Sequence, residues 1–351
     1  MNHSVIEEDL EDILGKNIAW QELSGRTVLI TGASGLLPSY MVDTCMALNR
    51  RQLLDSPVHV LVLVRNEAAA RRRFDQYRNN PHLEFLVQDV CEPVSWSGRV
   101  DFIIHAASQA SPKYYSVDPV GTLSSNVIGT LNLLKLAKEK QVQSMLFLSS
   151  GEIYGQVPEA LIPTKEEDYG YVNPMSVRSC YAESKRMAET MCVSWHHQYG
   201  VPVKVVRPFH TYGPGMKLDD GRVFADFVSN ILNRKDIVMT SEGTATRAFC
   251  YLSDATAGFF TVLLKGVSGE AYNIGNPDGT VSISELASTL IGLFPEYGLK
   301  VVRSAPFGKY VPSMSDKNIP DITKAMNLGW RPSTGIKAGF SRTIRSYSSE
   351  L

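Results

Sequence analysis

The sequence predicts an α/β protein built on a doubly wound parallel sheet, and three observations support this fold class. Five short apolar runs suited to buried strands lie between residues 27 and 149, and each is followed by a helix-compatible or loop segment. The first run, residues 27–30, leads into a turn with glycines at positions 32 and 35. Polar or small residues follow the later runs, where the carboxyl ends of parallel strands are expected to form one binding edge.

The composition of the chain indicates which classes of binding partner to expect. The chain has 351 residues, a formal net charge of −1 and 20% charged residues, which suits one large domain or two lobes that share a site. This charge gives no indication of a nucleic-acid or membrane partner. The apolar runs are shorter than the roughly 18 residues that span a bilayer, and the N-terminus lacks the apolar centre of a signal peptide. We therefore expect a cytoplasmic protein.

The five cysteines are scattered along the chain and form no C-x-x-C pair. This usage predicts small buried thiols in a reducing compartment. We expect neither a disulfide framework nor a metal site.

The glycine turn predicts a phosphate-binding corner at the start of a helix spanning residues 36–48. Gly32 permits the tight turn, and Gly35 lets the backbone approach a pyrophosphate at the helix N-terminus. Ser34 and Leu36 complete the predicted cofactor-binding turn. Pro38 occupies the third position of the glycine pattern, where a proline is tolerated because it lies in the first helical turn.

The end of the second apolar run, residues 58–64, bears on the choice of dinucleotide. Folds that prefer NAD place an acidic residue there, whereas this chain has Arg65. A guanidinium could pair with a 2′-phosphate, so NAD and NADP both remain open. The basic run at residues 71–73 is interpreted as a solvated helix face.

Two further strand ends are candidates for contact with the cofactor. Asp89 and Val90 follow the third run, where a side chain can reach the adenine. Ala106, Ala107 and Ser108 follow the fourth run, and their small side chains would let backbone lie against the cofactor.

A serine and a Tyr-x-x-x-Lys pattern give the most specific signal in the chain. Ser150 and Glu152 follow the fifth run, and Tyr181 and Lys185 lie some 30 residues further on. Four residues apart, Tyr181 and Lys185 would share one face of a helix. A nearby ammonium and a nicotinamide cation would both favour the phenolate, so Tyr181 is expected to act as a general base on a hydroxyl that Ser150 also binds.

Several longer stretches carry a family resemblance that extends from about residue 27 to residue 330. They are HAASQASPKYY (105–115), NVIGTLNLL (126–134), RSCYAESKRMAETMC (178–192), GPGMKLDDGRVFADF (213–227), TRAFCYLSD (246–254) and PDITKAMNLGWRP (320–332). With these stretches the chain resembles the extended short-chain dehydrogenase/reductase family, whose members modify nucleotide-linked sugars. Within that family the resemblance is strongest to UDP-glucuronate decarboxylases. It implies a Rossmann-type fold.

The resemblance also implies roles for individual residues. By its motifs, Ser150, Glu152, Tyr181 and Lys185 match the catalytic positions. Pro208 matches the point where the chain leaves the cofactor for the sugar nucleotide, and Tyr181 and Lys185 also contact the cofactor. The substrate-binding positions are Tyr115, Glu152, His210, Arg222 and Arg247.

Four positions depart from the family pattern. Pro38 replaces the third glycine, and Arg65 replaces the usual acid. His210 stands where the family usually has an asparagine beside the nucleotide diphosphate. Gly151 occupies the position that is aspartate in 4,6-dehydratases and serine in decarboxylases.

Gly151 helps to choose between reactions. The resemblance implies oxidation of a sugar at C4, and a 4,6-dehydratase must then protonate a leaving group at C6, for which glycine offers no acid. A 4-ketone with a C6 carboxylate is a β-keto acid that loses carbon dioxide through an enolate, and Glu152 could manage the proton at C5. We therefore predict decarboxylation of UDP-glucuronate to a UDP-pentose for polysaccharide biosynthesis. The alternatives are an NADPH-dependent reductase of a 4-keto sugar nucleotide, a 4,6-dehydratase or 4-epimerase, and a non-catalytic dinucleotide sensor.

The predicted elements and the family resemblance together indicate the domain organisation. Residues 1–25 form an N-terminal extension with a short amphipathic helix, and residues 26–206 form the dinucleotide-binding domain. Residues 207–351 form mainly a smaller substrate-binding lobe, interleaved with the first, to which a helix at 252–264 and a strand at 271–275 are assigned. Helices at 123–138 and 186–199 are candidates for a homodimer face.

Overall fold

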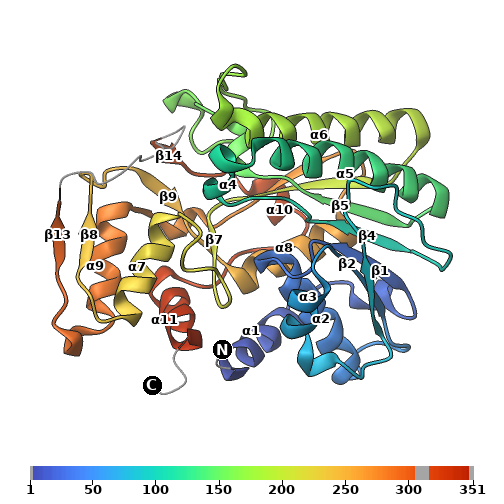
Figure 1. Cartoon of the computed structure of the whole chain (residues 1–351), viewed down its shortest axis with the longest axis horizontal. Helices are drawn as coiled ribbons and strands as arrows, with labels where there is room; N and C mark the ends of the chain where they lie inside the picture. Colours follow the sequence, from blue (N-terminus) through green and yellow to red (C-terminus); the bar gives the residue numbers. More distant parts are fainter. Residues whose placement is uncertain (1–2, 305–315, 348–351) are drawn as a thin grey trace.

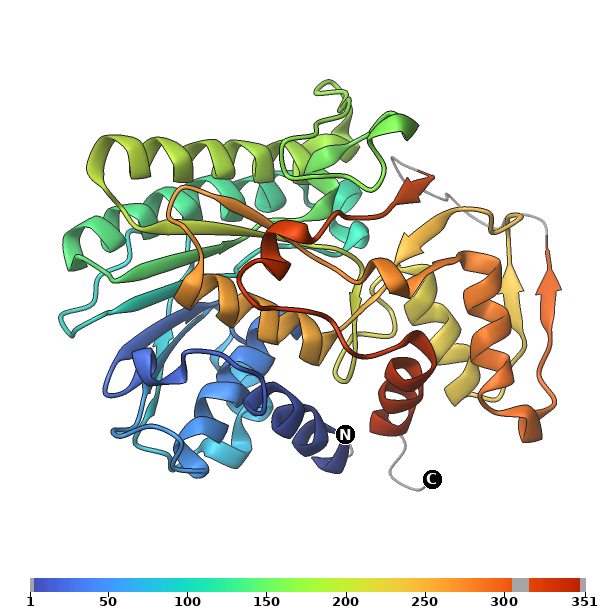
Figure 2. The same cartoon turned by 180° about the vertical axis from the view of Figure 1, so that it is seen from behind.

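The computed structural model describes residues 3–304 and 316–347. Residues 1–2, 305–315 and 348–351 of the predicted domain ranges lie outside the described part of the chain. The larger part is a sheet between two layers of helices, and the smaller part projects from the carboxyl end of that sheet (Figures 1 and 2).

The large sheet has seven strands, all parallel, in the order β11-β6-β5-β4-β1-β2-β3. Its strands are β1 (Thr27–Thr31), β2 (His59–Val64), β3 (Leu83–Val87), β4 (Phe102–His105), β5 (Ser144–Leu148), β6 (Val203–Pro208) and β11 (Ala271–Ile274). The predicted doubly wound parallel sheet of a Rossmann-type fold is therefore confirmed.

Alternate residues of each strand face opposite layers of helices. Val28 and Ile30 of β1 lie in one apolar core, and Leu29 lies in the other. The first layer contains α1 (His3–Leu14), α2 (Leu36–Arg50), α3 (Glu67–Arg73) and α8 (Leu252–Lys265), and the second contains α5 (Pro119–Lys140) and α6 (Cys180–Tyr199). Because both faces are covered, the strands consist of nearly continuous apolar residues.

The strand order reverses at β1, which pairs with β2 on one side and β4 on the other. The register sets Thr31 of β1 beside His105 of β4, and Thr31 Oγ1 lies 2.9 Å from His105 Nδ1. Ligands of such sheets bind outside the carboxyl ends of the strands at this reversal.

The smaller part has its own apolar core, formed by helices and short strands. It contains α7 (Val223–Leu232), α9 (Ile283–Gly292), α11 (Ile336–Tyr347), β7 (Thr211–Tyr212), β8 (Ile237–Met239), β9 (Thr246–Ala248), β10 (Cys250–Tyr251), β12 (Thr280–Ser282), β13 (Val301–Arg303) and β14 (Lys317–Asn318). The short helices α4 (Pro112–Val117) and α10 (Thr323–Met326) lie in connections.

Two elements assigned to the smaller lobe belong to the large sheet instead. β11 pairs with β6 at the sheet edge, and α8 packs in the first layer of helices. The assignment fails because strand pairing and helix docking depend on contacts that are distant in sequence, whereas the sequence pattern is local.

The N-terminal extension forms the predicted helix, α1, which joins the two parts of the molecule. Asp9 is fully buried and its carboxylate accepts hydrogen bonds from Tyr40 of α2 (3.0 Å), Tyr251 of β10 (2.8 Å) and Arg342 of α11 (3.2 Å). Burial raises the pKa of Asp9 to about 6, although these three partners oppose the shift. One carboxylate therefore ties α1 to both the larger and the smaller part of the molecule.

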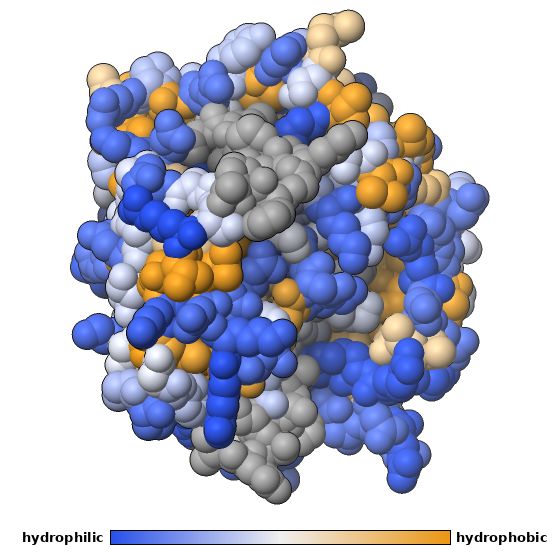
Figure 3. Space-filling view, turned by 60° about the vertical axis from the view of Figure 1, so that its left-hand side comes forward, coloured by the Kyte–Doolittle hydropathy of each residue, from blue (hydrophilic) through white to orange (hydrophobic). Residues whose placement is uncertain are grey.

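Figure 3 shows a face on which apolar patches alternate with hydrophilic side chains. Among the described residues, no helix combines the length and apolar character needed to cross a membrane.

Candidate active site

The glycine turn after β1 has the close backbone approach that a phosphate-binding corner needs. Gly32 has φ +64°, and a Cβ added to it would lie 2.7 Å from Cα of Ala107. Thr31 Oγ1 accepts hydrogen bonds from the amides of Ala106 and Ala107, at 3.2 and 3.1 Å. The ends of β1 and β4 are thus fastened together, and no side chain fits at Gly32.

The start of α2 presents backbone N–H groups that have no helical carbonyl to bond. Gly35 is the N-cap residue with extended backbone, and Leu36 begins the helix. Ser34 is exposed beside it. Pro38 is buried in the first turn, as predicted, where its missing N–H removes no helical hydrogen bond.

Arg65 at the end of β2 is paired with an acid on the neighbouring strand end. Its guanidinium lies 3.7 Å from the carboxylate of Asp89, and its side chain is 64% exposed. The other oxygen of Asp89 accepts from the amide of Cys91 at 2.9 Å, which fixes the carboxylate. A 2′-phosphate beside Arg65 would meet the negative charge of Asp89, so this pair favours NAD over NADP. Val90, which follows Asp89, is buried beneath α5.

Ser150 lies two residues after the end of β5 and is the N-cap residue of the 3-10 helix η3 (Gly151–Tyr154). Its hydroxyl accepts from the amide of Glu152 at 3.1 Å and lies near the phenol of Tyr181, whose ionised form it favours. The structure therefore brings together the predicted serine and tyrosine, although 31 positions separate them in the sequence.

Tyr181 lies in the first turn of α6 and is 5% exposed. Burial raises its pKa to about 12, and the hydrogen bond from Ser150 and the charges of Arg222 and Arg178 oppose the shift. The protein's own residues thus leave Tyr181 protonated at neutral pH. A nicotinamide cation close to the phenol would favour its ionised form.

Lys185 lies one helical turn after Tyr181, as the spacing predicts, and is 2% exposed. Its ammonium donates to the carbonyl of Leu148 at 2.7 Å, and the Nζ atom lies 5.8 Å from the centre of the Tyr181 ring. Burial lowers the pKa of Lys185 to about 7, against the attraction of Glu189 one turn further on.

Tyr115 and Arg222 border this group on the side of the smaller part. The Tyr115 ring stacks on the Tyr181 ring, with centroids 5.0 Å apart. The Tyr115 hydroxyl and an Arg222 N–H both donate to the carbonyl of Ala110, at 3.0 and 3.2 Å. Arg222 is also 3.4 Å from the carboxylate of Asp220.

His210 and Arg247 lie further along the same side. Burial and the charges of Arg247 and Arg222 hold the pKa of His210 well below its usual range, so its imidazole is neutral. Within the described ranges, its buried Nδ1 atom has no hydrogen-bond partner. Arg247 on β9 is 6% exposed and donates to the carbonyls of Thr246 and Asp316, at 2.8 and 2.9 Å.

Arg178 belongs to this group and was missed by the sequence analysis. It lies in the 3-10 helix η5 (Val177–Ser179), and its guanidinium is 3.2 Å from the carboxylate of Glu152 and 4.6 Å from the centre of the Tyr115 ring. The available signal was its place three residues before Tyr181, which puts both residues on one side of a helical turn.

The remaining predicted positions are distributed along the carboxyl edge of the sheet. Ser108 follows β4 with its hydroxyl buried, and Pro208 ends β6. No cluster of three or more metal-ligating side chains occurs in residues 3–304 and 316–347.

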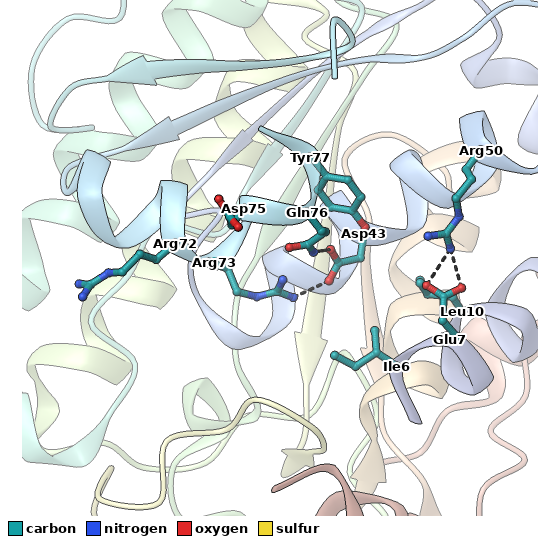
Figure 4. A pocket seen from close by; sticks show the side chains of 10 residues that line it. All are labelled: Ile6, Glu7, Leu10, Asp43, Arg50, Arg72, Arg73, Asp75, Gln76 and Tyr77. Carbon is teal, nitrogen blue, oxygen red and sulfur yellow. Dashed lines mark hydrogen bonds and ion pairs between the residues drawn. The ribbon is translucent and has the colours of Figure 1, made fainter. Parts of the chain in front are cut away.

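A pocket of about 700 Å³ lies away from this edge, among α1, α2, α3 and the turn that follows α3. Four of its charged groups form two pairs: Asp43 with Arg73, and Glu7 with Arg50 at 2.6 Å (Figure 4). These pairs hold α1 and α3 against α2, and the pocket shares none of the predicted site residues.

Comparison with protein families matches residues 28–275 to the NAD dependent epimerase/dehydratase family. The chain is 36% identical over 318 residues to UDP-glucuronic acid decarboxylase 6 of Arabidopsis thaliana, which covers 90% of this chain and 87% of that protein. It is 36% identical over 335 residues to UDP-glucuronic acid decarboxylase 1 of Xenopus tropicalis, covering 94% of this chain and 74% of that protein.

Solved structures have the same fold. A UDP-glucose 4-epimerase from Thermotoga maritima with UDP-glucose superposes with a TM-score of 0.77 at 24% identity, covering 92% of this chain and 98% of that one. A dTDP-glucose 4,6-dehydratase from Streptomyces venezuelae with NAD bound gives 0.77 at 25% identity, covering 91% and 96%. A UDP-glucuronic acid 4-epimerase from Bacillus cereus with UDP-glucuronic acid and NAD gives 0.72 at 22% identity, covering 91% and 98%.

Proposed function

Since the chain belongs to the NAD dependent epimerase/dehydratase family, we propose that it decarboxylates UDP-glucuronate to a UDP-pentose through a transient 4-keto sugar. It is an NAD-dependent nucleotide-sugar enzyme, and the decarboxylases among its relatives match it over most of their length. The residues that support the choice of reaction are Gly151, Glu152 and the cations around them.

The residues at the ends of β1 and β4 fit the dinucleotide. The space that a Cβ of Gly32 would fill lies against the backbone of Ala107, and the free N–H groups of α2 begin at the next turn. NAD supplies a hydride acceptor, so that C4 of the sugar is oxidised and later reduced again without net consumption of cofactor.

Tyr181, Ser150 and Lys185 act on the sugar hydroxyl at C4. The Ser150 hydroxyl favours the ionised form of Tyr181, and Tyr181 takes the hydroxyl proton when the site carries the positive charge of the cofactor. Lys185 is fixed by the carbonyl of Leu148, one turn of helix from the phenol.

Cationic side chains outnumber carboxylates on the substrate side: Lys185, Arg178, Arg222 and Arg247 against Glu152 and Asp220. This excess suits a substrate with a diphosphate and a sugar carboxylate. We assign Arg247 and Arg222 to these anionic groups, with the neutral His210 between them as a hydrogen-bond partner.

Gly151 is the observation that carries the choice of reaction. A Cβ at this position would lie 3.2 Å from the ring of Phe209, so an acidic side chain would fit only if that ring shifted by a few tenths of an ångström. Glu152, the neighbouring carboxylate, is engaged by Arg178. The site therefore lacks an acid for a leaving group at C6, whereas a 4-keto sugar with a C6 carboxylate loses carbon dioxide without one.

The paired Arg65 weakens the reductase alternative, which depends on NADPH. Its guanidinium lies 3.7 Å from the carboxylate of Asp89, so a 2′-phosphate bound there would also meet a negative charge. Ser150, Tyr181 and Lys185 are assembled, which argues against a non-catalytic sensor.

We also propose a cytoplasmic homodimer. The long helices α5 and α6 pack side by side and carry exposed apolar residues, among them Val120, Ile128, Met187 and Val193, at 43–69% exposure. All five cysteines are free thiols, as expected in a reducing compartment.

Proton NMR with candidate substrates tests the reaction. Purified enzyme is incubated separately with UDP-glucuronate, with dTDP-glucose, and with a 4-keto-6-deoxy sugar nucleotide plus NADPH. We expect UDP-glucuronate to lose its carboxylate and give pentose C5 methylene signals. A 6-deoxy methyl signal from dTDP-glucose, a 4-epimer that keeps its carboxylate, or stoichiometric oxidation of NADPH would each replace the decarboxylase assignment.

A further inference from the structure

Arg178 is a partly buried cation of the active site to which the proposed reaction assigns no role of its own. It lies in η5, just before the start of α6, and its side chain is 17% exposed. The guanidinium lies between Glu152 and Tyr115, which come from η3 and α4.

The first contact of Arg178 is with Glu152. Its Nη2 atom donates to Oε2 of Glu152 at 3.2 Å, and the Glu152 side chain is 26% exposed. A guanidinium fixes both the charge and the direction of a carboxylate that it binds. The place of Glu152 therefore depends on Arg178.

The second contact is with the face of an aromatic ring. The guanidinium carbon lies 4.6 Å from the centre of the Tyr115 ring, and that ring lies 5.0 Å from the Tyr181 ring with 19° between the planes. A guanidinium over an aromatic face is attracted by the negative charge density of the ring. Arg178 thus also holds the ring against which Tyr181 packs.

The other donors of Arg178 are left unused. Its Nε and Nη1 atoms are buried and have no hydrogen-bond partner among residues 3–304 and 316–347. Arg207, a buried arginine with a structural role, is different: it bonds both oxygens of Glu189, the hydroxyl of Tyr154 and the carbonyl of Glu166. Leaving buried donors unpaired is unfavourable, and such exceptions concentrate at functional sites.

We propose that Arg178 is a positioning residue that holds Glu152 and the Tyr115–Tyr181 stack in one fixed arrangement. One guanidinium then aligns two groups: the carboxylate that manages the proton at C5, and the phenol that takes the proton of the C4 hydroxyl. The inference rests on the proposed function, because it needs both groups to act on one sugar ring.

The kinetic test compares Arg178→Met and Arg178→Lys with wild type. Misplacement of a reacting group by about 1 Å costs about 100-fold in rate, so we expect kcat of Arg178→Met to fall about 100-fold while the Kd for UDP changes less than about twofold. Arg178→Lys keeps the charge without the planar fork and should recover part of the rate. Incorporation of solvent deuterium at C5 should fall together with reduction of the bound cofactor, since both groups are misplaced.

Arg99→Met is the matched control. Arg99 also forms an ion pair, at 2.6 Å to Asp101, but it precedes β4 at the opposite end of the sheet. We expect this variant to keep wild-type rates. Melting temperatures and UDP binding of all variants separate misplacement from unfolding, and Arg178→Lys stands in for Arg178→Met if the latter does not fold.

A readout without substrate separates this inference from the proposed function. The charged groups that act on Tyr181 are Arg222, Glu152 and Arg178, and Lys185 lies near its ring. In NAD-loaded enzyme with 13C-labelled tyrosine, Arg178→Met should move the titration of Tyr181, assigned with Tyr181→Phe, upward by about one pH unit. Arg178→Lys should stay closer to wild type.

The outcomes are distinct. Unchanged Tyr181 titration together with wild-type kcat in Arg178→Met would overturn the positioning role, whatever sugar nucleotide the enzyme uses. Loss of UDP binding in proportion to the loss of rate would overturn it in favour of a purely structural role. If wild type leaves UDP-glucuronate intact and the titration still moves, the reaction assignment fails and the role of Arg178 stands.

Discussion

The ring of Tyr115 lies on the ring of Tyr181, with centroids 5.0 Å apart and planes inclined by 19°. The contact joins α4 to the first turn of α6 and keeps water from one face of the phenol. It contributes to the burial that raises the pKa of Tyr181 to about 12. Proton transfer at Tyr181 thus requires more positive charge than Arg222 and Arg178 supply.

Tyr181→Phe should abolish turnover while leaving the site intact. The substitution removes the hydroxyl that exchanges a proton with the substrate and keeps the stacked ring, so we expect a loss of about 10²–10⁴-fold in kcat. The dissociation constant for NAD, measured by calorimetry, should change less than about twofold. Activity near the wild-type level would contradict this assignment and show that another group acts as the base.

Gly32→Ala and Gly200→Ala form a matched pair for the phosphate-binding turn. Both glycines have positive φ, at +64° and +69°, but a Cβ at Gly200 meets nothing within 4 Å, whereas one at Gly32 meets the Ala107 backbone at 2.7 Å. Gly200→Ala should lower the free energy of unfolding by about 1 kcal/mol, from strain alone. Gly32→Ala should lower it by about 2–5 kcal/mol and also abolish stabilisation by NAD.

Those two effects are read by urea unfolding with and without NAD. At 100 times its dissociation constant, NAD should stabilise wild type and Gly200→Ala by about 2.7 kcal/mol. Equal losses in the two glycine variants, with NAD stabilisation retained in both, would argue against a cofactor at this turn.

Replacement of Arg65 should affect the two dinucleotides almost equally, because Asp89 already holds its guanidinium. We expect Arg65→Ala to change the dissociation constants of NAD and NADP each by less than about threefold. Asp89→Asn should free Arg65 and tighten NADP binding by about tenfold, the effect of one additional charge-assisted hydrogen bond of about 1.4 kcal/mol. A selective loss of NADP affinity in Arg65→Ala would instead show that the phosphate displaces Asp89.

The buried Asp9 predicts a pH dependence of stability. Its pKa is about 6 in the folded protein and about 3.9 in an unfolded chain, so the folded state binds the proton more tightly. Its contribution is fully present below about pH 4 and is lost as the pH rises through 6. Between pH 4 and 7 the free energy of unfolding of wild type should therefore fall relative to Asp9→Asn, by about 2–3 kcal/mol.

Urea unfolding of both proteins across this range measures the difference. Asp12→Asn is the control, since Asp12 binds the same Arg342 from an exposed position at 2.6 Å. Asp12→Asn keeps the buried Asp9, so its stability should still fall between pH 4 and 7 as in wild type. A flat difference between wild type and Asp9→Asn would mean that Asp9 does not change its affinity for protons on folding.

Much of the fold could be predicted because it depends on local sequence. The apolar residues before Gly32 gave β1, and the helix predicted at residues 36–48 is α2, Leu36–Arg50. The placement of β11 could not be predicted this way, since AYNIG fits a strand in either part of the molecule. Its place follows from pairing with β6, more than 60 residues earlier in the chain.

The candidate site could likewise be predicted only where its residues lie close together in the sequence. Tyr181 and Lys185 lie on one helix, so their spacing was enough to bring them together. Arg178 and Glu152 meet only because η3 and η5 approach each other in space. Their separation of 26 residues in the sequence does not correspond to neighbouring positions on one helix or strand. The direction of the Lys185 ammonium, toward Leu148 of β5, likewise follows from the packing of α6 on the sheet.

The position of β11 at the edge of the large sheet has a consequence for synthesis on the ribosome. When β6 leaves the exit tunnel, one of its edges has no partner and the layer that α8 will cover is still exposed. The apolar layer can be covered once α8 has emerged, at residue 265, and the strand edge only after residue 274. The nascent chain therefore carries an open strand edge during the synthesis of more than 60 residues, and for most of this interval the apolar surface is also uncovered, so holding chaperones are expected to bind it.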